Sequence, residues 1–189
     1  MTIHDEKAHL LTAIARGAIA QAFGRRVQQA SLPGWLSLTG ATFVTLTQGG
    51  QLRGCIGSLE AHRPLVDDLE RNARAAAFDA PRFPPLAEDE LDRTRVEVSI
   101  LSKPEPMHFA TEADALAQLR PGVDGIILEA GWQRATFLPQ VWEQLPRPAE
   151  FLAHLKRKAG LPVDYWSEDV RLQRYTVEKY KEDLQETTP

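Results

Sequence analysis

The sequence predicts a single α+β domain over residues 1–189, with a mostly antiparallel sheet flanked by helices. Three observations predict this class. Apolar residues recur at helical spacing in some segments, other short segments alternate as strands do, and a glycine pair joins two of these strands as a hairpin. Strands and helices do not follow the regular βαβ order of a parallel sheet. A chain of this length can bury a core that needs neither metal nor disulfide.

The first half of the chain is expected to contain two helices and a hairpin. Apolar spacing defines the first helix, and Gly24 provides its stop. Pro64 suits the first turn of the second helix, because proline has a fixed φ and lacks the N–H that this turn leaves unpaired. The expected elements are helix 6–23, strands 41–47 and 52–59 joined through Gly49 and Gly50, a helix from Pro64, and a rigid proline-rich loop over 79–86.

The second half is expected to add strands and two further helices. Thr111 is suited to begin a short helix, with Glu112 and Asp114 near the positive end of the helix dipole. The expected elements are strand 96–102, a helix from Thr111, a hairpin of strands 124–129 and 133–138 around Gly131, helix 149–159, and a final strand 170–175 followed by a polar tail.

Composition excludes several classes of function. The net charge is −4, whereas a duplex-binding domain shows a basic stripe, so we expect no nucleic-acid partner. No apolar stretch approaches the roughly 20 residues that cross a bilayer, and no basic segment followed by an apolar run begins the chain. We therefore expect no membrane association. A single cysteine fits a reducing compartment, and we expect a cytoplasmic protein.

The cysteine lies in a distinctive stretch, Leu52-Arg53-Gly54-Cys55-Ile56-Gly57. Because side chains alternate along a strand, two faces are predicted. One carries Arg53, Cys55, Gly57 and Leu59, and the other carries Leu52, Gly54, Ile56 and Ser58. Arg53 and Cys55 would then be about 6.5–7 Å apart at Cα. A nearby cation lowers a thiol pKa and favours the reactive thiolate.

The two glycines favour a functional site. Glycine inside a strand often marks a bulge or a close approach by a ligand, and bulges are frequent beside active sites. A structural alternative competes with this interpretation, because free cysteine is among the most buried residue types and packs as a small hydrophobe.

A nucleophilic cysteine also needs a base. Of the five histidines, His62 lies nearest to the Cys55 strand in sequence, and Glu60 is a second candidate. Both are also typical of exposed charges beside a helix or at a strand end. Glu97 is a further acidic residue of interest because it lies within a strand. No histidine has metal-ligand spacing with another, so we predict no metal site.

The chain resembles the AMMECR-type domain family, whose prokaryotic members are called AmmeMemoRadiSam system protein A. The hallmark is LRGCIG, and Arg82 and Phe83 match a Pro-Arg-Phe element. Ala80 departs from the family pattern, in which Asp, Pro, Arg and Phe are contiguous. The resemblance rests on LRGCIGSLEAHRPL, NARAAAFDAPRFPPL, RVEVSILSKPEPM, PGVDGIILEAGWQRATFLPQVWEQLP and FLAHLKRKAGLP.

The resemblance implies a compact α+β protein with a larger and a smaller lobe. It also implies an association with a Memo-like protein and a radical SAM protein. It assigns no established reaction and no cofactor.

Two functions compete. The first is an enzyme of unknown reaction that acts on a small molecule through a Cys55 thiolate, and we favour it over the second. Arg53, Glu60 and His62 would assist catalysis. Gly54, Gly57, Ser58, Arg82 and Phe83 would bind an anionic or planar substrate. The second is a non-catalytic module that binds a ligand or a partner protein in the same place. Exposed tryptophans would favour it, because tryptophan anchors interfaces.

Overall fold

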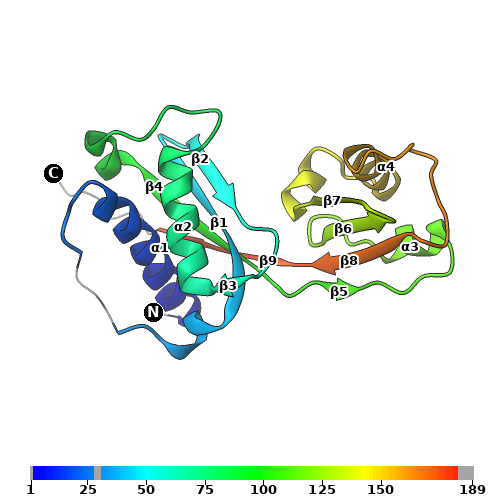
Figure 1. Ribbon diagram of the computed structural model, residues 1–189, viewed down its shortest axis with the longest axis horizontal. Coiled ribbons are helices and arrows are strands. Elements are labelled where there is room, and N and C mark those ends of the chain that lie inside the picture. Colours follow the sequence, from blue (N-terminus) through cyan, green and yellow to red (C-terminus); the bar gives the residue numbers. More distant parts are fainter. Residues whose placement is uncertain (1, 28–30, 183–189) are drawn as a thin grey trace. The chain divides into compact units, whose positions relative to one another are not determined.

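A computed structural model describes residues 2–27 and 31–182. The chain divides into two compact units. Unit 1 comprises Met1–Leu101 and Glu178–Pro189, and unit 2 comprises Ser102–Val177. The predicted α+β class is confirmed, since both units combine an antiparallel sheet with helices (Figure 1).

Unit 1 is built on a five-stranded sheet in the order β2-β1-β4-β9, with the short strand β3 also pairing with β1. β1 pairs in antiparallel fashion with β2, β3 and β4. The elements are α1 (Ile3–Ala22), β1 (Thr39–Gln48), β2 (Gln51–Gly57), β3 (Arg63–Pro64), α2 (Leu65–Phe78), β4 (Arg95–Leu101) and β9 (Val177–Lys181), with 3-10 turns over Gly34–Ser37 and Glu88–Arg93.

Both helices of unit 1 cover the same face of its sheet. A capping box at Thr2 begins α1. The apolar residues of α1 and α2 pack together in one core cluster. The strand residues in this core have one parity, with Val44 and Leu46 on β1 and Val98 on β4, all buried. The other parity, which includes Thr45, therefore lies on the opposite face. We call this opposite face the open face.

Unit 2 carries a four-stranded antiparallel sheet in the order β5-β8-β6-β7. Its core includes Trp142, stacked on Phe151 with ring centroids 3.7 Å apart. Lys156 is 1% exposed and pairs with Glu112. The elements are β5 (Glu105–Pro106), α3 (Glu112–Gln118), β6 (Gly125–Ala130), β7 (Gln133–Phe137), α4 (Pro148–Lys158) and β8 (Arg171–Tyr175), with a 3-10 turn over Pro139–Glu143.

Most predicted elements are present within a few residues of their expected bounds, but the predicted polar tail is wrong in part. Residues Val177–Lys181 form β9, which joins the unit 1 sheet beside β4. Tyr180 is 2% exposed and packs into the unit 1 core, while Lys179 and Lys181 are exposed. The sequence did not reveal this strand because its residues are mostly charged. A strand that buries only one face needs few apolar residues. The rest of the predicted tail, residues 183–189, lies outside the described residues.

Candidate functional site

The hallmark residues Leu52 to Gly57 lie in β2, at one edge of the unit 1 sheet. A tight turn joins β1 to β2, where Gly49 has φ +56° and Gly50 has φ +79°. Glycine is suited to this turn because left-handed backbone is strained for other residues. The register shifts between Leu46, opposite Gly54, and Thr47, opposite Leu52, which leaves Arg53 as an extra residue. The bulge predicted from the glycines is thus present.

Gly54 lets β2 approach α2 closely. A Cβ built on Gly54 would lie 2.1 Å from the backbone oxygen of Ala76. Ile56, two residues further on, packs against the core between the sheet and the helices. Gly54, Ile56 and Ser58 share one face as predicted, and this face is occupied by contacts within the fold. The prediction that Leu52 shares this face is wrong, because the bulge interrupts the alternation and leaves Leu52 opposite Thr47, a residue of the other parity.

Ser58 follows β2 and joins a buried polar network. Its hydroxyl donates to the Asp68 carboxylate at 2.7 Å. The same carboxylate, 1% exposed, accepts from the Thr42 N–H and hydroxyl, both at 2.8 Å, and from Asn72 at 3.0 Å. Arg63 also pairs with it at 3.4 Å. These five donors around one buried carboxylate compensate its lost hydration, and they join α2 to β1 and to the end of β2.

Sequence reasoning missed Asp68 and Asn72. Both are buried, four residues apart on α2, among apolar positions of the helix such as Leu69 and Ala73. Polar residues at core spacing are the signal that could have found them, since a buried polar group requires partners.

Arg53 binds the loop that follows α2. Its guanidinium donates to the Glu90 carboxylate at 2.9 and 3.1 Å, and to the carbonyls of Pro84 at 2.9 Å and Pro85 at 3.4 Å. The pKa of the Glu90 carboxyl is lowered to about 2. The hydrogen bonds from Arg53 are the largest cause, and the hydrogen bond from the Ala87 N–H is the second. This contact holds the proline-rich loop against β2. A role for Arg53 at the thiol stays a prediction.

Glu60 and His62, the two predicted bases, lie together between β2 and β3. The His62 Nε2 is 2.8 Å from a Glu60 carboxylate oxygen. The imidazole side chain is 67% exposed. Cys55 instead has its hydrogen-bond contact with Thr45, at 3.4 Å between Sγ and Oγ1. The catalytic roles predicted for this pair stay predictions.

Cys55 is half-buried on the open face, in a row of side chains that crosses the sheet. The register places Thr45 between Cys55 on β2 and Glu97 on β4. Directly opposed residues in antiparallel strands have Cβ atoms about 4.5–5.5 Å apart. Glu97, from the far end of this row, pairs with Lys181 at 3.5 Å and Lys179 at 3.9 Å. The row therefore presents a thiol, a hydroxyl and a carboxylate on one surface.

An aromatic ring borders this row. Phe43 lies opposite Gly57, and a Cβ on Gly57 would lie only 2.2 Å from the Phe43 ring. Because Gly57 has no side chain, the Phe43 ring can lie over this position of β2, two residues from Cys55. An apolar surface beside polar groups is a common composition for ligand sites.

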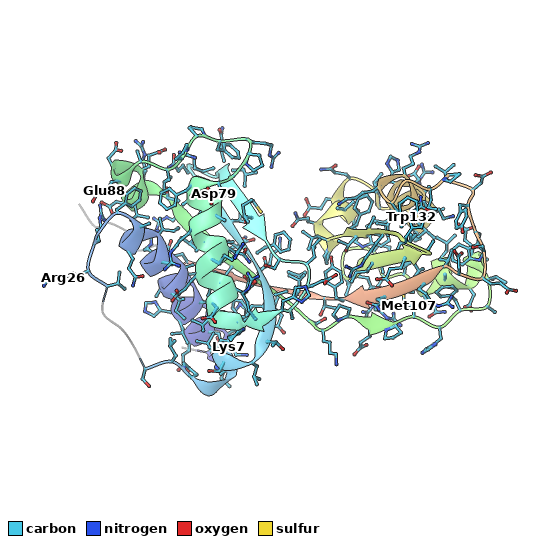
Figure 2. All side chains as sticks on the ribbon, viewed as in Figure 1. Lys7, Arg26, Asp79, Glu88, Met107 and Trp132 are labelled. Atoms are coloured by element: carbon cyan, nitrogen blue, oxygen red, sulfur yellow. The ribbon has the colours of Figure 1, made fainter. Side chains whose placement is uncertain are left out.

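Arg82 and Phe83 lie in the loop that Arg53 holds. The Arg82 guanidinium lies over the Phe83 ring, 5.8 Å from its centroid. Asp79, labelled in Figure 2, is the exposed residue that ends α2, and Ala80 after it is buried. The binding role of Arg82 and Phe83 stays a prediction.

The tryptophans differ in exposure. Trp132, labelled in Figure 2, is 91% exposed beside Gly131 in the turn between β6 and β7, whereas Trp142 is buried in the core of unit 2. Trp35 and Trp166 are half-buried and pack against the two cores. Exposed tryptophan, the feature expected of a binding module, is therefore present at Trp132.

Metal-binding clusters and membrane-spanning helices are both absent from the part of the chain that the structure describes. No cluster of three or more His, Cys, Asp or Glu side chains suited to a metal ion occurs within residues 2–27 and 31–182. Among the described helices, none is both long and apolar enough to traverse a bilayer.

Comparison with known proteins agrees with the fold and with the hallmark. The AMMECR1 family model matches residues 12–180, and the chain belongs to this family. A protein of Methanothermobacter thermautotrophicus is 46% identical over 143 residues, which cover 75% of this chain and 74% of the relative. A protein of Thermococcus onnurineus is 37% identical, covering 96% of this chain and 93% of the relative.

A solved structure also matches. The crystal structure of an uncharacterised protein from Pyrococcus horikoshii has a TM-score of 0.79 at 35% sequence identity. The match covers 95% of this chain and 93% of that chain. The identification as an AMMECR-type protein is thus confirmed, and the relatives carry no named reaction.

Proposed function

We propose that this AMMECR1-family protein binds a small molecule on the open face of unit 1, with the Cys55 thiol as the central contact. One observation carries the proposal. Arg53, Gly54 and Ile56 of the hallmark are occupied by contacts within the fold, while Cys55 is half-buried on the open face. The hallmark thus serves to hold a thiol on a defined surface.

The side chains around the thiol define the ligand. Thr45 and Glu97 offer a hydroxyl and a carboxylate, and Phe43 offers an apolar ring. A ligand that fits this surface has a flat or apolar part and at least one hydrogen-bond donor. Gly54 and Ser58 support β2 from the other side, so they act on binding through the position of the strand.

Binding is favoured over catalysis because the candidate activating groups have other partners. Arg53 pairs with Glu90, and Glu60 pairs with His62. A nucleophilic thiol requires a base or a cation close to the sulfur.

A cysteine-dependent enzyme is the second candidate, and the contact between Cys55 and Thr45 is the observation that favours it. In that mechanism the thiol would donate its proton to the Thr45 hydroxyl while that hydroxyl passes its own proton to the Glu97 carboxylate, the next group in the row. The sulfur would then be a thiolate and the Glu97 carboxyl would be neutral. The substrate would be a small electrophile bound against Phe43.

A thermal-shift screen of a metabolite library tests the binding function. A true ligand raises the melting temperature of the wild-type protein, and Cys55→Ser and Thr45→Val each lose most of that shift. Trp132→Ala, an exposed change in unit 2, is the matched control and keeps the shift. An equal shift in wild type and Cys55→Ser contradicts the proposal. In that case the Memo-like and radical SAM proteins that the family resemblance implies become the partners to test by pull-down.

A further inference from the structure

Besides its side chains, β2 presents main-chain hydrogen-bonding groups at the edge of the sheet. In the sheet order β2-β1-β4-β9, β2 is a terminal strand. One of its sides pairs with β1, and no strand of the described chain pairs with the other. We call this other side the free edge.

The register shows which groups point to the free edge. The Ser58 N–H donates to the Thr42 carbonyl at 2.8 Å. Antiparallel ladders alternate between pairs that exchange hydrogen bonds and pairs that do not. The main-chain N–H and C=O of Ile56, two residues before Ser58, therefore point toward β1. The main-chain N–H and C=O of Cys55 and Gly57 point to the free edge. This direction follows from the backbone and is independent of the thiol.

The two edges of the sheet differ in their protection. Lysine on an edge strand discourages the addition of another strand, and β9 carries Lys179 and Lys181. From Gly54 to Gly57, β2 has no lysine, proline or charged residue. The bulge at Arg53 and its bonds to Pro84 and Pro85 close only the amino-terminal end of β2.

We propose that the free edge from Cys55 to Gly57 receives an extended peptide segment of a partner protein as an added strand. In an antiparallel pair, opposed residues exchange two hydrogen bonds. Three peptide residues therefore suffice to satisfy the outward N–H and C=O groups of both Cys55 and Gly57. Strand addition of this kind is a recurrent mode of peptide recognition. The proposal goes beyond the proposed ligand site because its contacts on β2 are main-chain groups and do not include the Cys55 thiol.

A peptide fits this edge better than a second copy of the chain does. The free stretch is short, and it lies between the proline-rich loop bound by Arg53 and the inserted residues that carry Glu60 and His62. A β2 strand from a second copy would bring the same two loops against this stretch. A peptide without such flanks can enter.

Charge further defines the peptide. Arg82 is exposed and has no acidic partner among residues 2–27 and 31–182. It lies two residues before Pro84, whose carbonyl is bound by Arg53. A peptide residue that reaches the proline-rich loop thus meets an unpaired guanidinium, which favours an acidic side chain there.

Amide hydrogen exchange on the full chain is the first test. The amides of Ile56 and Ser58 are expected to exchange slowly, and those of Cys55 and Gly57 are expected to exchange rapidly. Slow exchange at Cys55 and Gly57 in the free protein would mean that the edge is already covered, and would overturn the proposal.

A displayed library of random eight-residue peptides is the second test, with the native full chain as bait. Selected peptides are expected to be extended and acidic, and to slow exchange at Cys55 and Gly57. Cys55→Pro removes an outward N–H while leaving the ladder with β1 intact, and is expected to weaken binding about tenfold. Cys55→Ala, which keeps the N–H, is the matched control and retains binding.

A modified peptide guards against misfolding of the proline variant. Methylation of a selected peptide at the main-chain nitrogen opposite Cys55 is expected to abolish binding to the wild-type protein, and methylation at the next nitrogen is expected to have little effect. Failure to select any peptide, or protection at amides elsewhere, overturns strand addition. The ligand site is tested separately, because Cys55→Ala removes the thiol but keeps the edge.

Discussion

The two faces of β2 differ in what their side chains do. On the helix-facing side, Gly54 lies against Ala76 and Ser58 joins the Asp68 network. On the open face, Cys55 has a single hydroxyl contact, with Thr45, among the described residues. Adjacent residues of one short motif therefore serve different purposes, and one face supports the fold while the other presents a thiol. Changes on the first face are expected to reduce stability, and changes on the second are expected to reduce binding.

The largest expected loss of stability comes from Asp68→Asn. The change removes the charge that Thr42, Ser58, Asn72 and Arg63 surround, and it introduces an amide N–H₂ among donors. We expect the free energy of unfolding to fall by about 3 kcal/mol. Urea denaturation followed by circular dichroism measures it.

Asp67→Asn provides a matched control for that experiment. Asp67 is the preceding residue on the same helix and is exposed. Its change is expected to alter stability by less than about 0.5 kcal/mol. Equal losses in the two variants would show that the network contributes nothing beyond a helix-terminal charge.

Gly54→Ala tests the close approach of β2 and α2. The added Cβ would lie 2.1 Å from the Ala76 carbonyl oxygen, and backbone on both sides limits relaxation. We expect a loss of about 2 kcal/mol, as for other overpacked sites. Denaturant titration beside Cys55→Ala, an open-face change of the neighbouring residue, makes the comparison. Similar stabilities for the two variants would contradict the division between the faces.

Glu90→Gln tests the ion pair by which Arg53 holds the proline-rich loop. We expect the free energy of unfolding to fall by about 1–2 kcal/mol. The pH dependence follows from the lowered pKa. Because the pKa of Glu90 is about 2 in the folded protein against 4.5 as its ordinary value, its stabilisation is present above about pH 4.5. It is lost as pH falls from about 4.5 toward 2.

The control for Glu90→Gln is Glu88→Gln, which changes an exposed carboxylate of the same 3-10 turn. Thermal melts of both variants and of the wild type, at pH 7 and pH 3, provide the measurement. The difference in melting temperature between wild type and Glu90→Gln is expected to be smaller at pH 3 than at pH 7. A difference of constant size would show that the Glu90 charge does not stabilise the loop.

The sequence predicts much of this fold because its signals are local. The Gly49-Gly50 pair defined the hairpin, and apolar spacing defined α1 and α2. β9 was missed because Glu178, Lys179 and Lys181 mask the one buried tyrosine between them. A strand with one buried residue is recognised only once its neighbour in the sheet is known.

The candidate site was predicted in part. The alternation of side chains from Gly54 to Ser58 follows from strand geometry. The bulge at Arg53 interrupts the alternation before Gly54. The partner of Arg53 does not follow from strand geometry, because Glu90 lies 37 residues further along the chain. Thr45 and Glu97 join Cys55 through strand pairing, and pairing register is set by the whole sheet. Long-range contacts thus decide which neighbour each hallmark side chain has.

The alkylation rate of Cys55 in the native protein, followed by mass spectrometry across pH, tests most directly the claim that the hallmark presents a thiol on the open face. We expect Cys55 in the folded protein to react within about tenfold of its rate in urea. We expect the same rate in Asp68→Asn and Gly54→Ala under conditions where these variants remain folded. A thiol that stays inert until the protein unfolds would show that Cys55 is a packing residue and is not presented on the open face.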